Sequence, residues 1–239
     1  MNLSGKTALV TGGTDGIGRE LARALRARGA AVIVHGRDPG RLAAAADGFE
    51  TIAADLSAPA GVEALADALA DRPLDILVNN AGAGVAFDVS APIDLEAVDR
   101  CIFLNLHAPI RLAARLLPAL RARPEAMIVN VTSGLAIAPR AGSPVYCATK
   151  AGLRSFSMTL RQQLRGSGVH VLEALPPLVD TAMTASNTRH AKMSAADCAG
   201  AIVTAMERGR DEANVGATSW LRRLYSLSPA LARRLMLRY

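Results

Sequence analysis

The sequence has no long hydrophobic run, few aromatic side chains and only three cysteines. No apolar stretch approaches the ~18 residues of a membrane-spanning helix, and the first residues lack the build of a signal peptide. Cys101, Cys147 and Cys198 are an odd number without metal-ligand spacing, which favours a reduced, cytoplasmic protein. The histidines are scattered too, and we predict no metal site. One tryptophan, three tyrosines and four phenylalanines are too few to predict an aromatic-lined cleft.

Acidic side chains are absent after Glu212, where five arginines follow: Arg222, Arg223, Arg233, Arg234 and Arg238. These arginines carry most of the formal net charge of +6, so the rest of the chain is nearly neutral. It has no basic stripe with interleaved aromatic residues, and we therefore do not expect nucleic-acid binding.

The same C-terminal segment is amphipathic. Six leucines lie between Trp220 and the last residue, and Ser228-Pro229 is a good helix start because it combines an N-cap with a first-turn proline. We expect a domain over residues 1–217 and a basic amphipathic tail over 218–239. The favoured interpretation is that the tail packs on the domain or on a sister subunit. The alternative is an interfacial helix that contacts anionic lipid.

Segments of strand and helix character alternate along the chain. The β-rich runs are 7–11, 31–34, 50–53, 75–78, 127–131 and 169–172, with a short one at 214–216. Helical periodicity covers 16–28, 95–120 and 146–164, and Pro109 predicts a kink in the second of these helices. Continuous apolar strands separated by helices predict an α/β fold: a doubly wound, mostly parallel, Rossmann-like sheet in a single domain with a helical C-terminal extension.

A glycine-rich segment follows the first strand and opens the first helix. It reads Thr11, Gly12, Gly13, Thr14, Asp15, Gly16, Ile17, Gly18. A turn without side chains lets the backbone approach a pyrophosphate, and the unpaired amides at the helix N-terminus attract the anion. The position of this segment predicts a dinucleotide site.

The residues after the second strand indicate which dinucleotide is bound. NAD-preferring sites place an acidic side chain there to hold the ribose hydroxyls, whereas this chain has Gly36 followed by Arg37. A guanidinium suits a 2′-phosphate, although Asp38 could neutralise it and Asp15 stands where a basic side chain would have helped. NADP(H) is favoured over NAD(H).

Tyr146 and Lys150 form a Tyr-x3-Lys pair, thirteen positions after Ser133. A phenol is a weak base at neutral pH, but a lysine one helical turn away stabilises the phenolate and lowers the pKa. Together with a dinucleotide site, the pair predicts hydride transfer coupled to proton transfer. The alternative for Tyr146 and Lys150 is an ordinary contact on a helix surface.

With these motifs, the chain resembles the short-chain dehydrogenase/reductase family over about residues 5–181. The matching positions are the glycine-rich segment, Asp55, Leu56, Asn79, Asn80, Ala81, Gly82, Asn105, Ser133, Tyr146, Lys150, Val179 and Thr181. One departure is Pro176-Pro177, where the family usually has Pro-Gly, and this proline must alter the turn near the nicotinamide.

The resemblance implies a role for each of these residues. Tyr146 exchanges a proton with the substrate oxygen, Ser133 orients that oxygen, and Lys150 binds the nicotinamide ribose. Asn105 holds a water that joins Lys150 to solvent. Asp55 and Leu56 contact the adenine, Asn80, Ala81 and Gly82 lie along the cofactor, and Val179 and Thr181 hold the carboxamide.

We therefore expect an NADP(H)-dependent enzyme that interconverts a carbonyl and a secondary alcohol, as a homodimer or homotetramer. The polar segment at about 178–194, with Met183, Asn187, Arg189 and His190, predicts a mobile lid over a small or aliphatic substrate. The alternative is a cofactor-binding regulatory or scaffold protein on the same fold with little or no catalysis.

Overall fold

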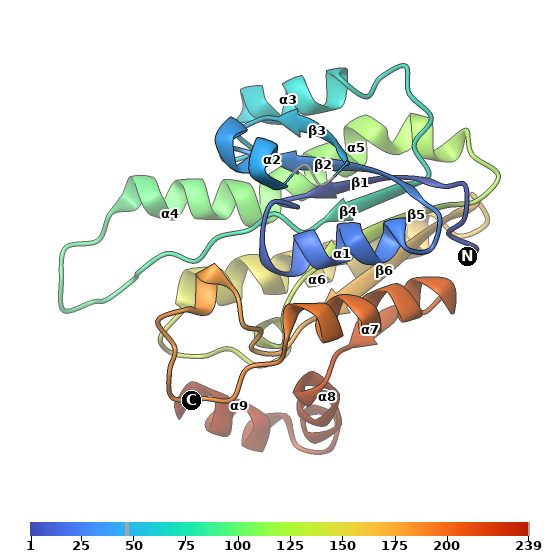
Figure 1. Cartoon of the computed structure of the whole chain (residues 1–239). Helices are drawn as coiled ribbons and strands as arrows, with labels where there is room; N and C mark the ends of the chain where they lie inside the picture. The colour runs from blue at the N-terminus through green and yellow to red at the C-terminus, as the bar shows by residue number, and fades with distance from the viewer. Residues whose placement is uncertain (46–47, 239) are drawn as a thin grey trace.

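A computed structural model of the protein describes residues 1–45 and 48–238, and these residues build one parallel sheet flanked by helices (Figure 1). Its strands are β1 (Thr7–Thr11), β2 (Ala31–Gly36), β3 (Glu50–Ala53), β4 (Ile76–Asn79), β5 (Ala126–Val131), β6 (Val169–Leu175) and β7 (Glu212–Asn214). Their spatial order is β3-β2-β1-β4-β5-β6-β7. The predicted doubly wound α/β fold is confirmed.

The helices of the described residues lie on both faces of the sheet. They are α1 (Gly16–Arg26), α2 (Pro39–Ala45), α3 (Pro59–Asp67), α4 (Leu95–Ile102), α5 (Ala108–Arg121), α6 (Pro144–Gln163), α7 (Ala195–Glu207), α8 (Ala217–Leu227) and α9 (Pro229–Arg238). Successive strand residues point to opposite faces. Val10 therefore packs in the core layer beneath α1 and α7, whereas Leu9 packs in the layer beneath α3 and α5.

The order of the strands reverses between β1 and β4, and this reversal opens a crevice at the carboxyl ends of the strands. The chain runs outward from β1 to β3, then crosses back to β4 and continues to β7 on the other side. Loops after β1 and β4 therefore diverge over the crevice. A parallel doubly wound sheet binds its ligands at this place.

The helix predicted over 95–120 is interrupted. A π-helical turn, Phe103–His107, separates α4 from α5, and it carries the predicted site residue Asn105. Pro109 lies in the first turn of α5, directly after the π turn, and it has no backbone N–H to donate to that turn. At the place of the predicted kink, the structure has a π turn that ends just before Pro109. π turns of this kind are frequent at functional sites.

The C-terminal residues form two helices that pack together at one end of the molecule (Figure 1). The short strand expected at 214–216 instead spans Glu212–Asn214, and Gly216 turns the chain into α8 with a φ of +52°. Helix α8 contacts β7 and the short 3-10 turn Gly134–Ala136 that follows Ser133. No helix among the described residues is both long and apolar enough to cross a membrane.

Candidate active site

A cavity of about 520 Å³ lies at the carboxyl ends of the strands. It collects the residues that sequence reasoning assigned to the cofactor. All of them line its wall: Gly12, Thr14, Asp15, Gly16, Ile17, Gly18, Arg37, Asp55, Leu56, Asn80, Ala81, Gly82, Tyr146, Lys150, Val179 and Thr181. We call this space the nucleotide cavity.

The glycines of the loop after β1 are required by close approaches of the backbone. Gly12 has a φ of +63° and Gly16 a φ of +53°, a conformation that other residues rarely adopt. A Cβ on Gly12 would lie 2.9 Å from the Cα of Ala81, and a Cβ on Gly18 would collide with the carbonyl oxygen of Gly12. The loop can therefore pack against the segment after β4 and turn into α1 only with glycine at these positions.

Two polar side chains fix this loop from opposite sides. The Asp15 Oδ1 accepts the Gly16 N–H at 2.7 Å and caps α1, so a carboxylate takes one amide at this helix N-terminus. The buried His35, at the end of β2, contacts the Gly12 N–H through Nδ1 at 3.3 Å and the Ala54 carbonyl through Nε2 at 2.9 Å. Burial lowers the pKa of His35, which keeps its Nδ1 free to accept.

His35 was treated in sequence reasoning as one of several scattered histidines, and its place under the loop was missed. One signal was available in the sequence. His35 is a polar residue that directly follows the apolar run 31–34 and directly precedes the predicted site at Gly36 and Arg37.

Two arginines and two carboxylates, Asp38 and Asp55, line the part of the nucleotide cavity that follows β2 and β3. Arg37 and Arg41 both line it, and Arg41 was missed by sequence reasoning. The Asp38 Oδ1 accepts the Arg41 backbone N–H at 2.7 Å, so this carboxylate caps the start of α2. Burial opposes ionisation of Asp55, but hydrogen bonds from Ser57 and the charge of Arg37 lower its pKa below the usual range.

The proposed proton donor lies where α6 begins. Tyr146 is in the first turn of this helix, and it lines both the nucleotide cavity and a neighbouring one together with Ser133, which follows β5. Lys150, one turn further, has its Nζ 5.6 Å from the centre of the Tyr146 ring. The Lys150 Nζ donates to the Val131 carbonyl oxygen at 2.8 Å. The ammonium is thus held beneath the ring by the end of β5.

The pKa of Tyr146 corrects one expectation. We predicted that Lys150 would lower it, but burial raises the pKa of Tyr146 to about 12, against a smaller opposing effect of the Ser133 hydrogen bond. Burial also lowers the pKa of Lys150 to about 8. Burial decides both pKa values. Removing the charged form of each side chain from water costs more free energy than the neighbouring charges and hydrogen bonds restore. In this structure the phenol holds its proton at neutral pH.

Asn105 does not lie on the wall of the nucleotide cavity. Its Nδ2 donates to the Ala83 carbonyl oxygen at 2.8 Å, and its Oδ1 accepts the Ala83 N–H at 2.9 Å. A Cβ on Gly82 would lie 3.1 Å from the Asn105 Oδ1 and 3.5 Å from the Lys150 Nζ. The Asn105 side chain therefore fixes the segment that follows β4.

A second cavity, of about 360 Å³, opens beside the first, and we call it the substrate cavity. Ser133, Tyr146, Pro176 and Pro177 line both cavities, so the hydroxyl pair lies at their junction. Both prolines are trans, and the Pro176 carbonyl accepts the Gly134 N–H at 3.0 Å.

Much of the wall of the substrate cavity comes from the C-terminal tail. Helices α8 and α9 supply Ala217, Thr218, Leu221 and Met236. Of the predicted lid residues, Met183 lines this cavity, whereas Asn187, Arg189 and His190 are not among the described residues that line it. Sequence reasoning missed the contribution of the tail, because no local pattern shows which surface a terminal helix covers.

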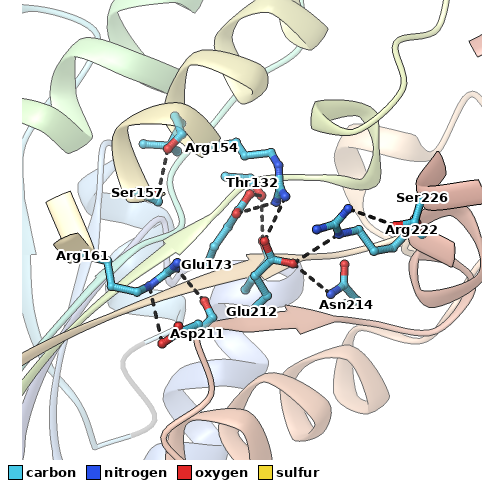
Figure 2. Close-up of polar contacts among 12 residues, drawn as sticks. Thr132, Arg154, Ser157, Arg161, Glu173, Asp211, Glu212, Asn214, Arg222 and Ser226 are labelled. Atoms are coloured by element: carbon cyan, nitrogen blue, oxygen red, sulfur yellow. Dashed lines mark hydrogen bonds and ion pairs between the residues drawn. The ribbon is translucent and has the colours of Figure 1, made fainter. Parts of the chain in front are cut away.

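A chain of polar and charged side chains connects Thr132, which precedes Ser133, to α8 (Figure 2). Glu173 on β6 is fully buried; it accepts the Thr132 hydroxyl at 2.7 Å and the Arg154 Nη1 at 2.6 Å. The Arg154 Nη2 continues to Glu212 at 2.9 Å, and Glu212 lies 3.5 Å from the Nε of Arg222 on α8. This network ties β5, α6, β6, β7 and α8 together behind Ser133.

This fold and cavity are those of a nucleotide-dependent oxidoreductase, and comparison with known proteins gives the family. The short chain dehydrogenase family matches residues 6–192, and the chain belongs to it. The predicted class of enzyme, a short-chain dehydrogenase/reductase, is confirmed.

Individual relatives agree. The chain is 47% identical over 189 residues to the uncharacterized oxidoreductase DltE of Bacillus subtilis (strain 168), covering 77% of this chain and 75% of that protein. It is 36% identical over 188 residues to a serine 3-dehydrogenase of Agrobacterium fabrum (strain C58), covering 76% of this chain and 75% of that protein. A short-chain dehydrogenase from Burkholderia cenocepacia J2315, solved in complex with NADP, superposes with a TM-score of 0.88 at 27% identity and covers 99% of both chains.

Proposed function

We propose that this oxidoreductase uses NADP(H) to interconvert a carbonyl and a secondary alcohol. One observation carries the proposal: Ser133 and Tyr146 lie on the wall shared by the nucleotide cavity and the substrate cavity. A proton donor at that junction can reach a substrate oxygen while the substrate carbon faces the nucleotide cavity.

The residues present fit a dinucleotide. The glycine loop and the start of α1 both line the nucleotide cavity, and the loop holds its shape only with glycine at these positions. A bound dihydronicotinamide supplies the hydride that reduces the carbonyl carbon, and it is itself oxidised. Tyr146 donates its phenolic proton to the carbonyl oxygen, while Ser133 donates a hydrogen bond to the same oxygen. A phenol with a raised pKa retains that proton until the oxygen becomes negative.

Lys150 would contact the ribose of the cofactor and favour the phenolate that remains after proton transfer. Asn105 acts in this proposal by holding Ala83, and thereby Gly82, beside Lys150. We call it a positioning residue; its expected water-binding role stays a prediction.

Support for NADP(H) comes from two arginines on the wall of the nucleotide cavity. Arg37 and Arg41 follow β2, where an NAD-preferring site has an acid. Two guanidinium groups suit a 2′-phosphate because each can form charge-assisted hydrogen bonds with it. The similar Burkholderia cenocepacia protein was solved with NADP.

The test is the variant Tyr146→Phe, with Tyr225→Phe on α8 as the matched control. We expect Tyr146→Phe to lose at least about 1,000-fold in kcat for NADPH-dependent carbonyl reduction, because it removes the proton donor. Its NADPH affinity, measured by fluorescence titration, should stay within about threefold, and Tyr225→Phe should keep its activity. Turnover near that of the unaltered chain in Tyr146→Phe would contradict the assigned role.

The alternative is a cofactor-binding regulatory or scaffold protein with chemistry lost. The placement of Ser133 and Tyr146 on the wall shared by both cavities, and the Lys150 ammonium held by the Val131 carbonyl, argue against it. A screen of ketones and secondary alcohols with both nicotinamides would revive the alternative if NADPH bound but no compound was turned over.

For the tail we propose a structural role, as part of the wall of the substrate cavity. Leu221 and Met236 supply apolar side chains to it, whereas Trp220 and Leu227 remain exposed. Liposome co-sedimentation of the full chain would test the lipid-binding alternative, which pelleting with anionic vesicles would favour. The expected homodimer or homotetramer, and cytoplasmic location, stay predictions that light scattering and cell fractionation would check.

A further inference from the structure

The substrate cavity is apolar apart from a few hydroxyls and one charge. Among the residues that the structure describes, Arg140 is the only ionised side chain on its wall. It lies between the turn after Ser133 and the start of α6, on the same wall as Tyr146. We propose that Arg140 binds a carboxylate of the substrate, so that the enzyme acts on oxo acids and hydroxy acids.

The guanidinium is held in place at one nitrogen and unsatisfied at another. The Arg140 Nη2 donates to the Ser143 Oγ at 2.7 Å. The Arg140 Nε is buried, and no atom of the described residues accepts a hydrogen bond from it. A buried N–H without an acceptor is unfavourable, so such groups in a native protein usually have a ligand or ordered water as partner.

No acid neutralises this arginine. Within residues 1–45 and 48–238, no carboxylate forms an ion pair with Arg140, whereas Arg154, also on the α6 side, has both Glu173 and Glu212. A cation in an apolar cavity without a counterion favours an anionic ligand, since the ligand supplies the missing charge. Arginine also fits a carboxylate geometrically, because its N–H groups form a fork.

The main chain around Arg140 is fixed as well. Its backbone N–H donates to the Cys147 Sγ at 3.4 Å, which ties the residue to the turn of α6 that carries Tyr146. Burial raises the pKa of Tyr146, and the charge of Arg140 is one of the opposing influences that lower it. The guanidinium is therefore close enough to act on the phenol electrostatically. A single small molecule could therefore place a carboxylate against Arg140 and a carbonyl oxygen against Tyr146.

This inference rests on the proposed function, since it names the substrate class of the same site. The experiment uses the full chain with NADPH and three oxo acids (pyruvate, 3-oxobutanoate and 4-oxopentanoate), each paired with its methyl ester. The measured quantity is the ratio of kcat/KM for an acid to kcat/KM for its ester. We expect at least one acid to be preferred, and Arg140→Gln to lower that ratio about 100-fold, because it removes a buried charge partner.

Two further variants separate binding from folding. Arg140→Lys keeps the charge but loses the fork, so it should recover part of the preference for the acid. Arg121→Gln changes an exposed arginine at the far end of α5 and should leave the ratio unaltered. Equal loss for acid and ester in Arg140→Gln would overturn the proposal, because it would show a structural role only.

A binding measurement keeps this inference distinct from the proposed function. Calorimetric titration of the NADPH-loaded protein with 4-oxopentanoate and with methyl 4-oxopentanoate requires no turnover. Tighter binding of the acid, lost in Arg140→Gln, would support the carboxylate site even if no carbonyl in the panel were reduced. Equal affinity for acid and ester in the unaltered chain would reject the site, whatever the enzyme reduces.

Discussion

The two cavities that meet at Tyr146 and Ser133 are built by different means. The wall of the nucleotide cavity includes the glycine loop after β1 and residues that follow β2, β3 and β4, together with later residues such as Lys150 and Thr181. The wall of the substrate cavity has no part of the glycine loop, and part of it comes from α8 and α9 at the opposite end of the chain. The first cavity is built around a turn whose glycines leave no room for a side chain, and the second depends on helices from the end of the chain.

This difference explains how each cavity tolerates change. The Gly12, Gly16 and Gly18 positions have no room for a Cβ, so the nucleotide cavity admits almost no substitution there. Leu221 and Met236 instead line the substrate cavity from α8 and α9, which pack on each other, and α8 contacts β7, where Arg222 lies 3.5 Å from Glu212. The first cavity is therefore sensitive to local sequence, and the second to whatever holds the tail against β7.

The largest effect should come from breaking the network behind the substrate cavity. Arg154→Met removes the partner of the fully buried Glu173, and we expect a loss of about 3–5 kcal/mol in the free energy of unfolding, or about 10 °C in Tm. Thermal unfolding followed by circular dichroism measures this. Arg165→Met, an exposed arginine after α6, is the matched control and should shift Tm by less than about 2 °C.

The network also predicts a partial rescue. Glu173→Gln in the Arg154→Met background removes the isolated charge, so the double variant should be more stable than Arg154→Met alone. If Arg154→Met and the double variant unfolded at the same temperature, the unpaired charge of Glu173 would not be the cause of the instability.

A smaller effect is expected at the nucleotide cavity, and it should be confined to cofactor choice. Arg37→Ala with Arg41→Ala removes both guanidinium groups, and we expect NADPH to bind about 100-fold more weakly while NADH affinity changes by less than about threefold. Fluorescence titration with the two cofactors measures both. Arg121→Ala is the control. Equal weakening for both cofactors would show that these arginines do not contact a 2′-phosphate.

The smallest effect on stability is expected at Lys150, which lines the nucleotide cavity one helical turn after Tyr146. Lys150 is buried and its pKa is lowered to about 8, so its charge destabilises the folded protein below that pH. We expect Lys150→Met to abolish turnover yet raise the stability at pH 7 by about 2 kcal/mol. The gain should shrink as pH rises above 8, because the folded lysine then loses its proton before the unfolded one does. Urea unfolding at pH 7 and pH 9 checks both statements.

The predictability of the molecule follows the same division. The alternation of apolar strands and helices predicted the fold, and the spacing of Gly12, Gly16 and Gly18 predicted the cradle. Tyr146 and Lys150 were found because one helical turn separates them. Each of these signals lies within a few residues of sequence, where geometry is set by the backbone alone.

The remainder depended on contacts between segments far apart in the sequence. The substrate cavity brings together Arg140, Leu221 and Met236, which are far apart in the sequence. No local sequence pattern indicates that these residues share one wall. The pKa of Tyr146 was predicted in the wrong direction, because the sequence shows a neighbouring charge but not how much water burial removes. His35 and Arg41 were missed for a related reason: their neighbours lie on other strands.

Met236, which lines the substrate cavity, lies three residues from the end of the 239-residue chain, on the last turn of α9. A purification tag or fusion partner attached at this terminus would lie next to a helix that lines the substrate cavity. Preparations tagged at opposite ends should therefore differ in the compounds they accept, and an N-terminal tag is the safer choice for any substrate screen.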